Sequence, residues 1–294
     1  MDVKITTLAD KAMLVKLTMR RANLTSRDAE AESVIQSQMD DQSLIVNRKL
    51  FRDKGNPINK ILTATSQIYQ YHKKHTLPYI DKGPRILPNG QYFEYTQHMR
   101  GLIGDVDNML KQSMPNYDAY VQMDIAYRSQ KPNSRALVSD YPTADEFEAK
   151  MGYDIRFSPM PESRHFLFDI NDEDLAAFDS ALEQAAQLAR SDYVARMLKP
   201  LSHLVDKLTK PIGTENSIFR DTAVENVVEG IEIARRLCID DSPEMQELTD
   251  KLDKTIAQYS TNLEWLRESP IVRERASKEL SQIAEAMGAF MGAA

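Results

Sequence analysis

The chain has 294 residues, of which 42% are hydrophobic and 28% charged, and its formal net charge is −7. This composition is typical of a soluble globular protein and excludes wholesale disorder. No apolar run approaches the roughly 18 residues that span a bilayer, and the first residues show no secretory signal, so we expect a cytoplasmic protein without a membrane partner. Cys238 is the only cysteine, which excludes an intrachain disulfide and a thiolate metal cluster.

Charge is unevenly distributed along the chain. Residues 1–140 hold 20 basic and 15 acidic side chains, whereas residues 141–294 hold 17 and 29. Within residues 42–100, ten basic side chains stand against three acidic ones. Such an asymmetry indicates a polyanion-binding surface in the first half, with a merely solvated charged face as the alternative.

The first elements are a strand and two helices. Residues 11–20, KAMLVKLTMR, alternate between apolar and polar side chains, which predicts a strand. A short helix is expected over 26–38 with Ser26 as its N-cap, and residues 43–52 fit either a helix or a strand. Asn56-Pro57 is typical of a helix start. The helix that follows would turn one apolar face to the core, made of Ile58, Ile61, Leu62, Thr65, Ile68 and Tyr69.

Turn residues interrupt the chain after this helix. Three prolines and Asn89-Gly90 predict an irregular loop over 78–90. Helices are expected at 91–112 and 115–129, with a linker at 130–141. Two alternating segments within 153–170, the second containing Phe166, Phe168 and Ile170, predict a β-hairpin.

From Asn171 onward the pattern is helical. A long helix capped by Asn171 is expected to residue 208, and another over 219–237. Apolar residues then recur at steps of three or four through 245–266 and 276–290, with Ser269-Pro270 between them. This spacing predicts an antiparallel helical hairpin over 243–291 with coiled-coil-like seams. The seams would either pack onto the long helices or serve association with a partner or a second copy, giving a homo-oligomer.

Motifs of known chemistry are weak in this sequence. It has no GxGxxG fingerprint, no Walker loop, no GxSxG elbow and no HExxH pair. His72 and His75, the GDVDN segment at 104–108 and the acids at 172–174 each lack the remaining ligands of a metal site. The GxxG in RGLIG at 100–104 matches an RNA-binding clamp in two glycines only. We therefore expect no enzyme activity, no cofactor and no metal.

One proline-broken stretch combines aromatic and basic side chains. Residues 69–95 read YQYHKKHTLPYIDKGPRILPNGQYFEY, with six aromatics among four lysines or arginines. Single-stranded nucleic-acid binders pair stacking platforms with a cationic groove. The alternative is a hydrophobic corner with a solvated rim, in which Tyr69 and Tyr92 face the core. Tyr71, Tyr79 and Tyr95 are then the aromatics that we expect to be exposed.

The candidate interface combines this stretch with basic residues upstream. Its stacking residues would be Tyr71, Tyr79 and Tyr95, and its phosphate contacts Lys16, Arg20, Arg21, Arg48, Lys49, Arg52, Lys73, Lys74, Lys82 and Arg85.

Three segments of the second half carry a resemblance. YPTADEF at 141–147, SRHFLFDI at 163–170 and FRDTAVENVVEGIEIARRL at 219–237 occur in an order that resembles a group of phage proteins without a catalytic motif. More specifically, the chain resembles the single-stranded-DNA-binding RNA polymerase cofactors of podophages. The resemblance implies an early phage protein in the host cytoplasm that binds unwound promoter DNA and helps a phage RNA polymerase to start middle transcription. A role in DNA replication belongs to the same hypothesis.

Together these patterns predict an α+β fold that is predominantly helical. We expect a mixed domain over 1–212, with small β-elements in the N-terminal and middle regions and the DNA-binding surface, and a helical region over 213–294. The leading hypothesis is a non-enzymatic single-stranded DNA-binding protein that regulates phage transcription. The rival hypothesis is a helical adaptor or assembly protein that acts through its C-terminal helices, such as an accessory to a phage ATPase.

Overall fold

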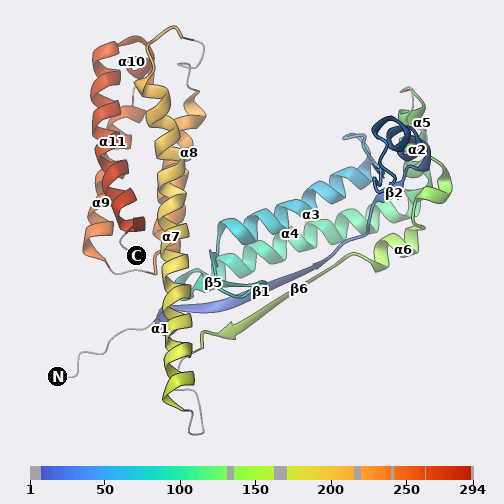
Figure 1. Ribbon diagram of the computed structural model, residues 1–294, viewed down its shortest axis with the longest axis horizontal. Helices are drawn as coiled ribbons and strands as arrows, with labels where there is room; N and C mark the ends of the chain where they lie inside the picture. The colour runs from blue at the N-terminus through green and yellow to red at the C-terminus, as the bar shows by residue number, and fades with distance from the viewer. Residues whose placement is uncertain are drawn as a thin grey trace. The chain divides into compact units, whose positions relative to one another are not determined.

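The computed structural model describes residues 8–130, 136–161, 171–214, 220–239, 242–261 and 263–292 (Figure 1). The fold is α+β and predominantly helical, with small antiparallel sheets and a helical C-terminal part, as predicted. The chain forms two compact units, each built from separate segments. We call Met1–Lys16, Lys73–Tyr95 and Arg156–Ala294 the bundle unit, and Leu17–His72 with Thr96–Ile155 the inserted unit. The boundary expected after residue 212 lies inside the bundle unit.

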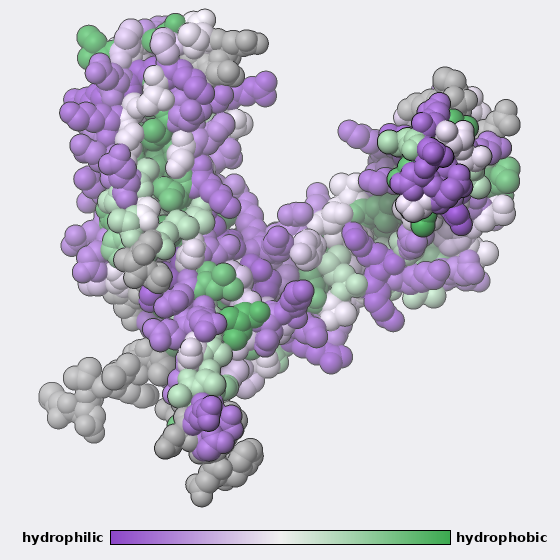
Figure 2. Space-filling view, viewed as in Figure 1, coloured by the Kyte–Doolittle hydropathy of each residue, from purple (hydrophilic) through white to green (hydrophobic). Residues whose placement is uncertain are grey.

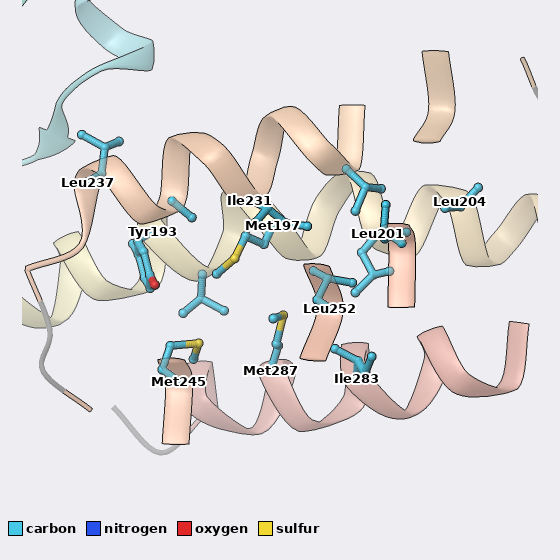
Figure 3. Packing of buried hydrophobic residues seen from close by; sticks show 14 of the residues in the cluster. Tyr193, Met197, Leu201, Leu204, Ile231, Leu237, Met245, Leu252, Ile283 and Met287 are labelled. Atoms are coloured by element: carbon cyan, nitrogen blue, oxygen red, sulfur yellow. The ribbon is translucent and has the colours of Figure 1, made fainter. Parts of the chain in front are cut away.

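Four long helices dominate the bundle unit. They are α7 (Asp172–Thr209), α8 (Asp221–Leu237), α9 (Pro243–Ser260) and α11 (Pro270–Gly292), with the short α10 (Leu263–Glu268) between the last two. α8 packs on α7 and α9, and α11 packs on α9 and α7, which closes a four-helix arrangement. On the face that Figure 2 shows, these helices carry mostly hydrophilic side chains. Their inner faces supply an apolar core that includes Met197, Leu201, Ile231, Leu252 and Ile283 (Figure 3).

The predicted seams are part of that core. Met245, Leu252 and Ile256 of α9 are buried, as are Leu280 and Met287 of α11. The interpretation of the hairpin as an intramolecular packing element is therefore confirmed. Local caps set its ends, because the side chains of Asn171, Ser242 and Ser269 accept hydrogen bonds from backbone amides in the first turns of α7, α9 and α11.

A four-stranded sheet has the order β4 (Leu77–Pro78), β5 (Pro84–Pro88), β1 (Ala12–Arg20) and β6 (Gly152–Pro159). The strand predicted over 11–20 is confirmed as β1, and the short α1 (Leu8–Lys11) precedes it. The prediction of an irregular loop over 78–90 is wrong for Pro84–Pro88, which forms β5. This segment pairs antiparallel with β1, with Ala12 opposite Pro88 and Lys16 opposite Pro84. Its prolines stand at the strand ends, and Ile86 and Leu87 between them are fully buried, so burial outweighs the turn signals.

The inserted unit contains the remaining elements. They are β2 (Thr25–Arg27), α2 (Ala29–Met39), β3 (Asn47–Lys49), α3 (Pro57–Lys74), α4 (Tyr92–Ser113), α5 (Tyr117–Ser129) and α6 (Ala144–Ala149), of which α3 and α4 extend into the segments of the bundle unit. Short 3₁₀ turns cover Met114–Asn116 and Val138–Asp140 in this unit, and Asn89–Gln91 in the bundle unit. β2 and β3 form a two-stranded antiparallel sheet, so part of the ambiguous segment 43–52 is a strand.

Several local predictions concern this part of the chain. The helices expected from Asn56-Pro57, over 91–112 and over 115–129 are confirmed, and Asn56 caps α3 by accepting a hydrogen bond from the amide of Ile58. Ser26 as the N-cap of the second helix is wrong: Asp28 caps α2, and the Ser26 hydroxyl donates to Asp140 instead. The first strand of the predicted hairpin is β6, while its second strand, with Phe166, Phe168 and Ile170, lies outside the described residues.

Candidate nucleic-acid interface

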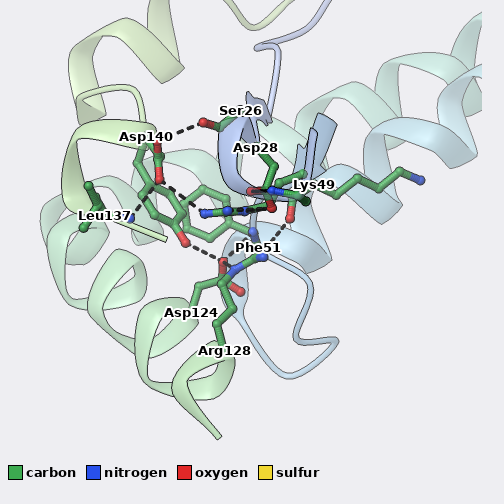
Figure 4. A network of polar contacts seen from close by, with 11 residues as sticks. Ser26, Asp28, Lys49, Phe51, Asp124, Arg128, Leu137 and Asp140 are labelled. Carbon is green, nitrogen blue, oxygen red and sulfur yellow. Dashed lines mark hydrogen bonds and ion pairs between the residues drawn. The ribbon is translucent and has the colours of Figure 1, made fainter. Parts of the chain in front are cut away.

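The best-defined polar site in the inserted unit is organised by Asp124 of α5. Its carboxylate is fully buried and accepts hydrogen bonds from the amides of Phe51 and Arg52, at 2.8 and 2.9 Å. It also accepts from Arg128 Nε at 2.7 Å and from the Tyr141 hydroxyl at 2.6 Å (Figure 4). Four donors therefore surround one charge, which is the condition under which a buried carboxylate is tolerated.

These contacts hold the loop after β3 in a strained conformation. Phe51 has a φ of 50°, in the left-handed region that costs a non-glycine residue about 1 kcal/mol or more. Its amide is held by Asp124, its carbonyl accepts from Asn59 Nδ2 at 2.7 Å, and its ring packs edge-on against Tyr141. Arg128 also donates to the Lys49 carbonyl. The loop 49–56 is thus fixed from both sides, which pre-organises the side chains that it displays.

The charge state of this site follows from the same contacts. Burial by itself would raise the pKa of Asp124, but the hydrogen bonds from Tyr141 and Arg128 outweigh burial and keep that pKa below its usual value. Burial and the bond to Asp124 raise the pKa of Tyr141. At neutral pH the site therefore contains a carboxylate, a guanidinium and a neutral phenol.

Arg48 belongs to a second polar layer beside this site. Its guanidinium forms an ion pair with Asp28 at 2.6 Å and lies 3.8 Å from Asp140, and its side chain is only 15% exposed. The hydrogen bond from Arg48 is the main cause that lowers the pKa of Asp28. Arg48 is therefore positioned to hold β3 in place, and its predicted role as a phosphate contact is not supported by its surroundings.

The neighbours of Arg48 in sequence point to solvent. Lys49, Arg52 and Lys54 are exposed, and none forms an ion pair with an acidic residue among those that the structure describes. Figure 4 shows the Lys49 side chain extending away from the polar network. Residues 47–74 contain seven lysines or arginines and a single acidic residue, Asp53.

The helix that follows continues this basic surface. α3 has 18 residues and no aspartate or glutamate. Its exposed positions include Lys60, Ser66, Gln67 and Tyr69, the last of which is 48% exposed. We define the basic surface as Lys49, Arg52, Lys54 and Lys60, all within the inserted unit. Tyr69 lies nine positions after Lys60, on the opposite flank of α3.

Two of the predicted aromatic assignments are reversed by the structure. Tyr95, expected to be exposed, is 1% exposed and lies edge-on to Phe157. Tyr69, expected to face the core, lies on a flank of α3 and contacts solvent. The buried face of α3 is narrower than the predicted one, because Ile58, Ile61, Thr65, Ile68 and His72 fill it. Tyr71 is partly covered and stacks on His98, with ring centroids 4.0 Å apart.

The remaining predicted contacts of the bundle unit lie in different environments. Lys74 pairs with Glu229, and Arg85 donates to the Thr76 hydroxyl at 2.6 Å and to the Thr76 carbonyl at 2.9 Å, so both have structural partners. Tyr79 is half-buried against the bundle core. The exposed group consists of Lys16, Lys73 and Lys82, and the Lys16 side chain lies against Gly83.

Arg20 and Arg21 of the inserted unit are also exposed at the end of β1. The guanidinium of Arg20 lies over Gly152 so closely that a Cβ there would be 2.7 Å from it. A side chain at position 152 would therefore displace Arg20. Arg20 and Arg21 are therefore not included in the basic surface.

Sequence reasoning did not assign the residues that shape this site. Lys54 and Lys60 were not among the predicted contacts. The absence of acidic residues from 54–74 is visible in the sequence and indicates a basic surface there. Asp124, Arg128 and Tyr141 were missed entirely. The i,i+4 spacing of Asp124 and Arg128 is visible in sequence, but such pairs usually lie on solvated helix faces.

Comparisons with known proteins add no assignment. No protein-family model, curated protein or solved structure matches this chain. Within the described residues, no helix is long and apolar enough to cross a bilayer. In the same part of the chain, no cluster of three histidine, cysteine or acidic side chains could hold a metal ion.

Proposed function

We propose that this protein binds single-stranded DNA through the basic surface of the inserted unit. The observation that carries the proposal is the loop 49–56, whose strained backbone is held by a buried carboxylate while Lys49, Arg52 and Lys54 extend to solvent. Strained, over-determined backbone tends to occur at functional sites. Lysines and arginines in such a position neutralise phosphates and release counterions on binding.

The acid-free face of α3 extends this surface along the chain. Exposed hydroxyls and amides, such as those of Ser66 and Gln67, are typical donors to phosphate and sugar oxygens. Tyr69 adds a ring on which an unpaired base can stack. Stacking needs bases that are not already paired within a duplex, so this combination favours a single strand.

The biological setting of the proposal is phage transcription. The resemblance to podophage single-stranded-DNA-binding polymerase cofactors supports a role in which the protein holds unwound promoter DNA for a phage RNA polymerase. The polymerase contact, the supporting role in replication and the host-cytoplasmic location belong to the same proposal. We favour it over the adaptor hypothesis because the C-terminal seams that an adaptor would use are buried within the bundle.

The test measures fluorescence anisotropy of labelled single-stranded and duplex DNA of equal length at several salt concentrations. We expect tighter binding to the single strand and an affinity that falls with salt by about 0.7 log units per phosphate contact per log unit of salt. The variant Lys49→Ala/Arg52→Ala/Lys54→Ala/Lys60→Ala should weaken binding and reduce the salt slope by about 3.

A matched control removes the same number of charges from the bundle unit. Lys199, Lys251, Lys254 and Lys278 are exposed on α7, α9 and α11, and replacing these four with alanine should leave DNA affinity close to wild type. Equal weakening by both variants would mean that net charge rather than this surface governs binding. Absence of wild-type binding at low salt would overturn the proposal itself.

A further inference from the structure

Four aromatic rings of the bundle unit form a continuous series from the interior to solvent. Tyr95 is buried and lies edge-on to Phe157, at a centroid distance of 6.3 Å. Phe157 contacts Tyr92 edge-on at 5.1 Å, and Tyr92 contacts Phe93 in the same way at 5.3 Å. Edge-to-face contacts of this kind are favourable and hold rings in fixed orientations. The series ends at Phe93, which is 82% exposed.

A surface hollow of about 540 Å³ lies beside the second and third rings. Its apolar lining includes Tyr92, Phe157, Met13 and Met160. Its polar groups include the exposed Asp10 and Asn89, whose side-chain amide donates to the Asp10 carbonyl at 3.0 Å. This combination of aromatic walls with a few polar groups is typical of sites for small planar ligands.

The charge of the lining restricts what can bind there. Among the described residues that line the hollow, Asp10 is charged and there is no lysine or arginine. A phosphate would be repelled by that carboxylate and would find no lysine or arginine among these described lining residues. An uncharged, planar group with hydrogen-bonding edges suits both the rings and the polar groups, and a nucleobase has these properties.

We infer that Phe93, whose ring contacts the lining residue Tyr92, and the hollow together form a nucleobase subsite of the proposed DNA-binding protein. The inference rests on the proposed function and adds a base-binding role for the bundle unit. The basic surface of the inserted unit contacts phosphates, whereas this subsite of the bundle unit contacts a base. An apolar side chain of a partner protein is the competing occupant, and the experiment separates the two.

The experiment compares an oligothymidylate with an abasic oligonucleotide of the same length and charge. Phe93→Ala should weaken binding of the oligothymidylate by about 5- to 150-fold, which is the loss of one stacked base. It should leave the salt slope and the affinity for the abasic strand unchanged, because no phosphate contact is removed. Ile271→Ala, which shortens an 81% exposed side chain on α11, is the matched control and should bind like wild type.

A spectroscopic readout tests the contact directly. Trp265 is the only tryptophan, so the double variant Trp265→Phe/Phe93→Trp places the sole indole at position 93. Stacking with a base should quench its fluorescence on addition of oligothymidylate, and the abasic strand should leave that fluorescence unchanged.

The outcomes distinguish this inference from the function on which it rests. If wild type does not bind single-stranded DNA, the proposed function fails and the subsite with it. If wild type binds and the basic-surface variant weakens binding while Phe93→Ala does not, only the subsite is overturned. Equal weakening for the ordinary and abasic strands by Phe93→Ala would also overturn it, because the lost contact would then not be to a base.

Discussion

The interiors of the two units are built from different chemistry. The core of the bundle unit is apolar over four helices, with methionines, leucines and isoleucines such as Met197, Leu252 and Ile283 packed between them. The inserted unit buries Asp124 and Arg128 in contact with each other, beside the buried ring of Phe51. Most of the buried polar residues that the structure describes belong to this unit.

The two kinds of interior specify the structure of their units in different ways. Apolar packing is non-directional, so many side chains share the stabilisation of the bundle. A buried ion pair is directional and adds little net stability, because desolvation offsets most of the attraction. Its value in the inserted unit is that it dictates one conformation of the loop 49–56, which displays the basic surface.

Removing the central carboxylate should have the largest effect. Asp124→Ala leaves Arg128 buried without its partner and frees the amides of Phe51 and Arg52, so we expect a loss of about 3–5 kcal/mol in the free energy of unfolding. Denaturant titration followed by circular dichroism measures this loss. Asp250→Ala, which breaks an exposed ion pair with Arg235, should cost at most about 1 kcal/mol. A similar small loss for Asp124→Ala would contradict the role given to the network.

A cavity in the bundle core should cost somewhat less. Leu252 is fully buried between the helices, and Leu252→Ala should lower the free energy of unfolding by about 3 kcal/mol. Leu188→Ala makes the same chemical change at a side chain of α7 that is 42% exposed, and it should cost well under 1 kcal/mol. Equal losses in the two variants, measured by the same titration, would show that the bundle core is not packed as described.

Two glycines, one in each unit, should respond in opposite directions to replacement by alanine. A Cβ at Gly230 of α8 would lie 2.9 Å from the backbone carbonyl oxygen of Arg196 on α7, so Gly230→Ala should push these helices apart and destabilise by about 1–3 kcal/mol. A Cβ at Gly101 of α4 meets nothing within 4 Å. Gly101→Ala should therefore stabilise by up to about 1 kcal/mol, because alanine is the better helix former. Thermal unfolding of both variants shows whether the two shifts have opposite signs.

Acid should affect the inserted unit through its carboxylates, and we expect this to be the smallest effect. The pKa of Asp124 is lowered in the folded protein, and hydrogen bonds from Arg48 and Arg27 lower the pKa of Asp28 and Glu32. Groups with depressed folded pKa values contribute stability above their unfolded pKa, about 4, and lose it as the pH falls toward the folded value. Unfolding midpoints at pH 7 and pH 3 should therefore differ in wild type and differ less in Asp124→Asn. An unchanged midpoint at pH 3 would contradict this expectation.

The local chain determined much of the secondary structure. Helix starts at Asn56-Pro57, Asn171, Ser242 and Ser269 follow from side chains that cap their own first turns, so they can be read without tertiary contacts. The alternation over 11–20 and the three-and-four spacing over 245–290 likewise specify a strand and two helices, because each pattern buries one face only in that conformation.

Tertiary structure decided which side chains are available at the candidate site. Tyr95 and Tyr69 exchanged their expected roles, because the phase of a helix against its neighbours is set by the whole packed face rather than by one aromatic. Arg48 forms ion pairs with two aspartates, which lie 20 and 92 positions away in the chain. Asp124 holds backbone amides more than 70 residues away. Sequence determined the residue types that this protein brings to its surface, but only long-range packing decided which of them are buried as structure and which remain free to bind.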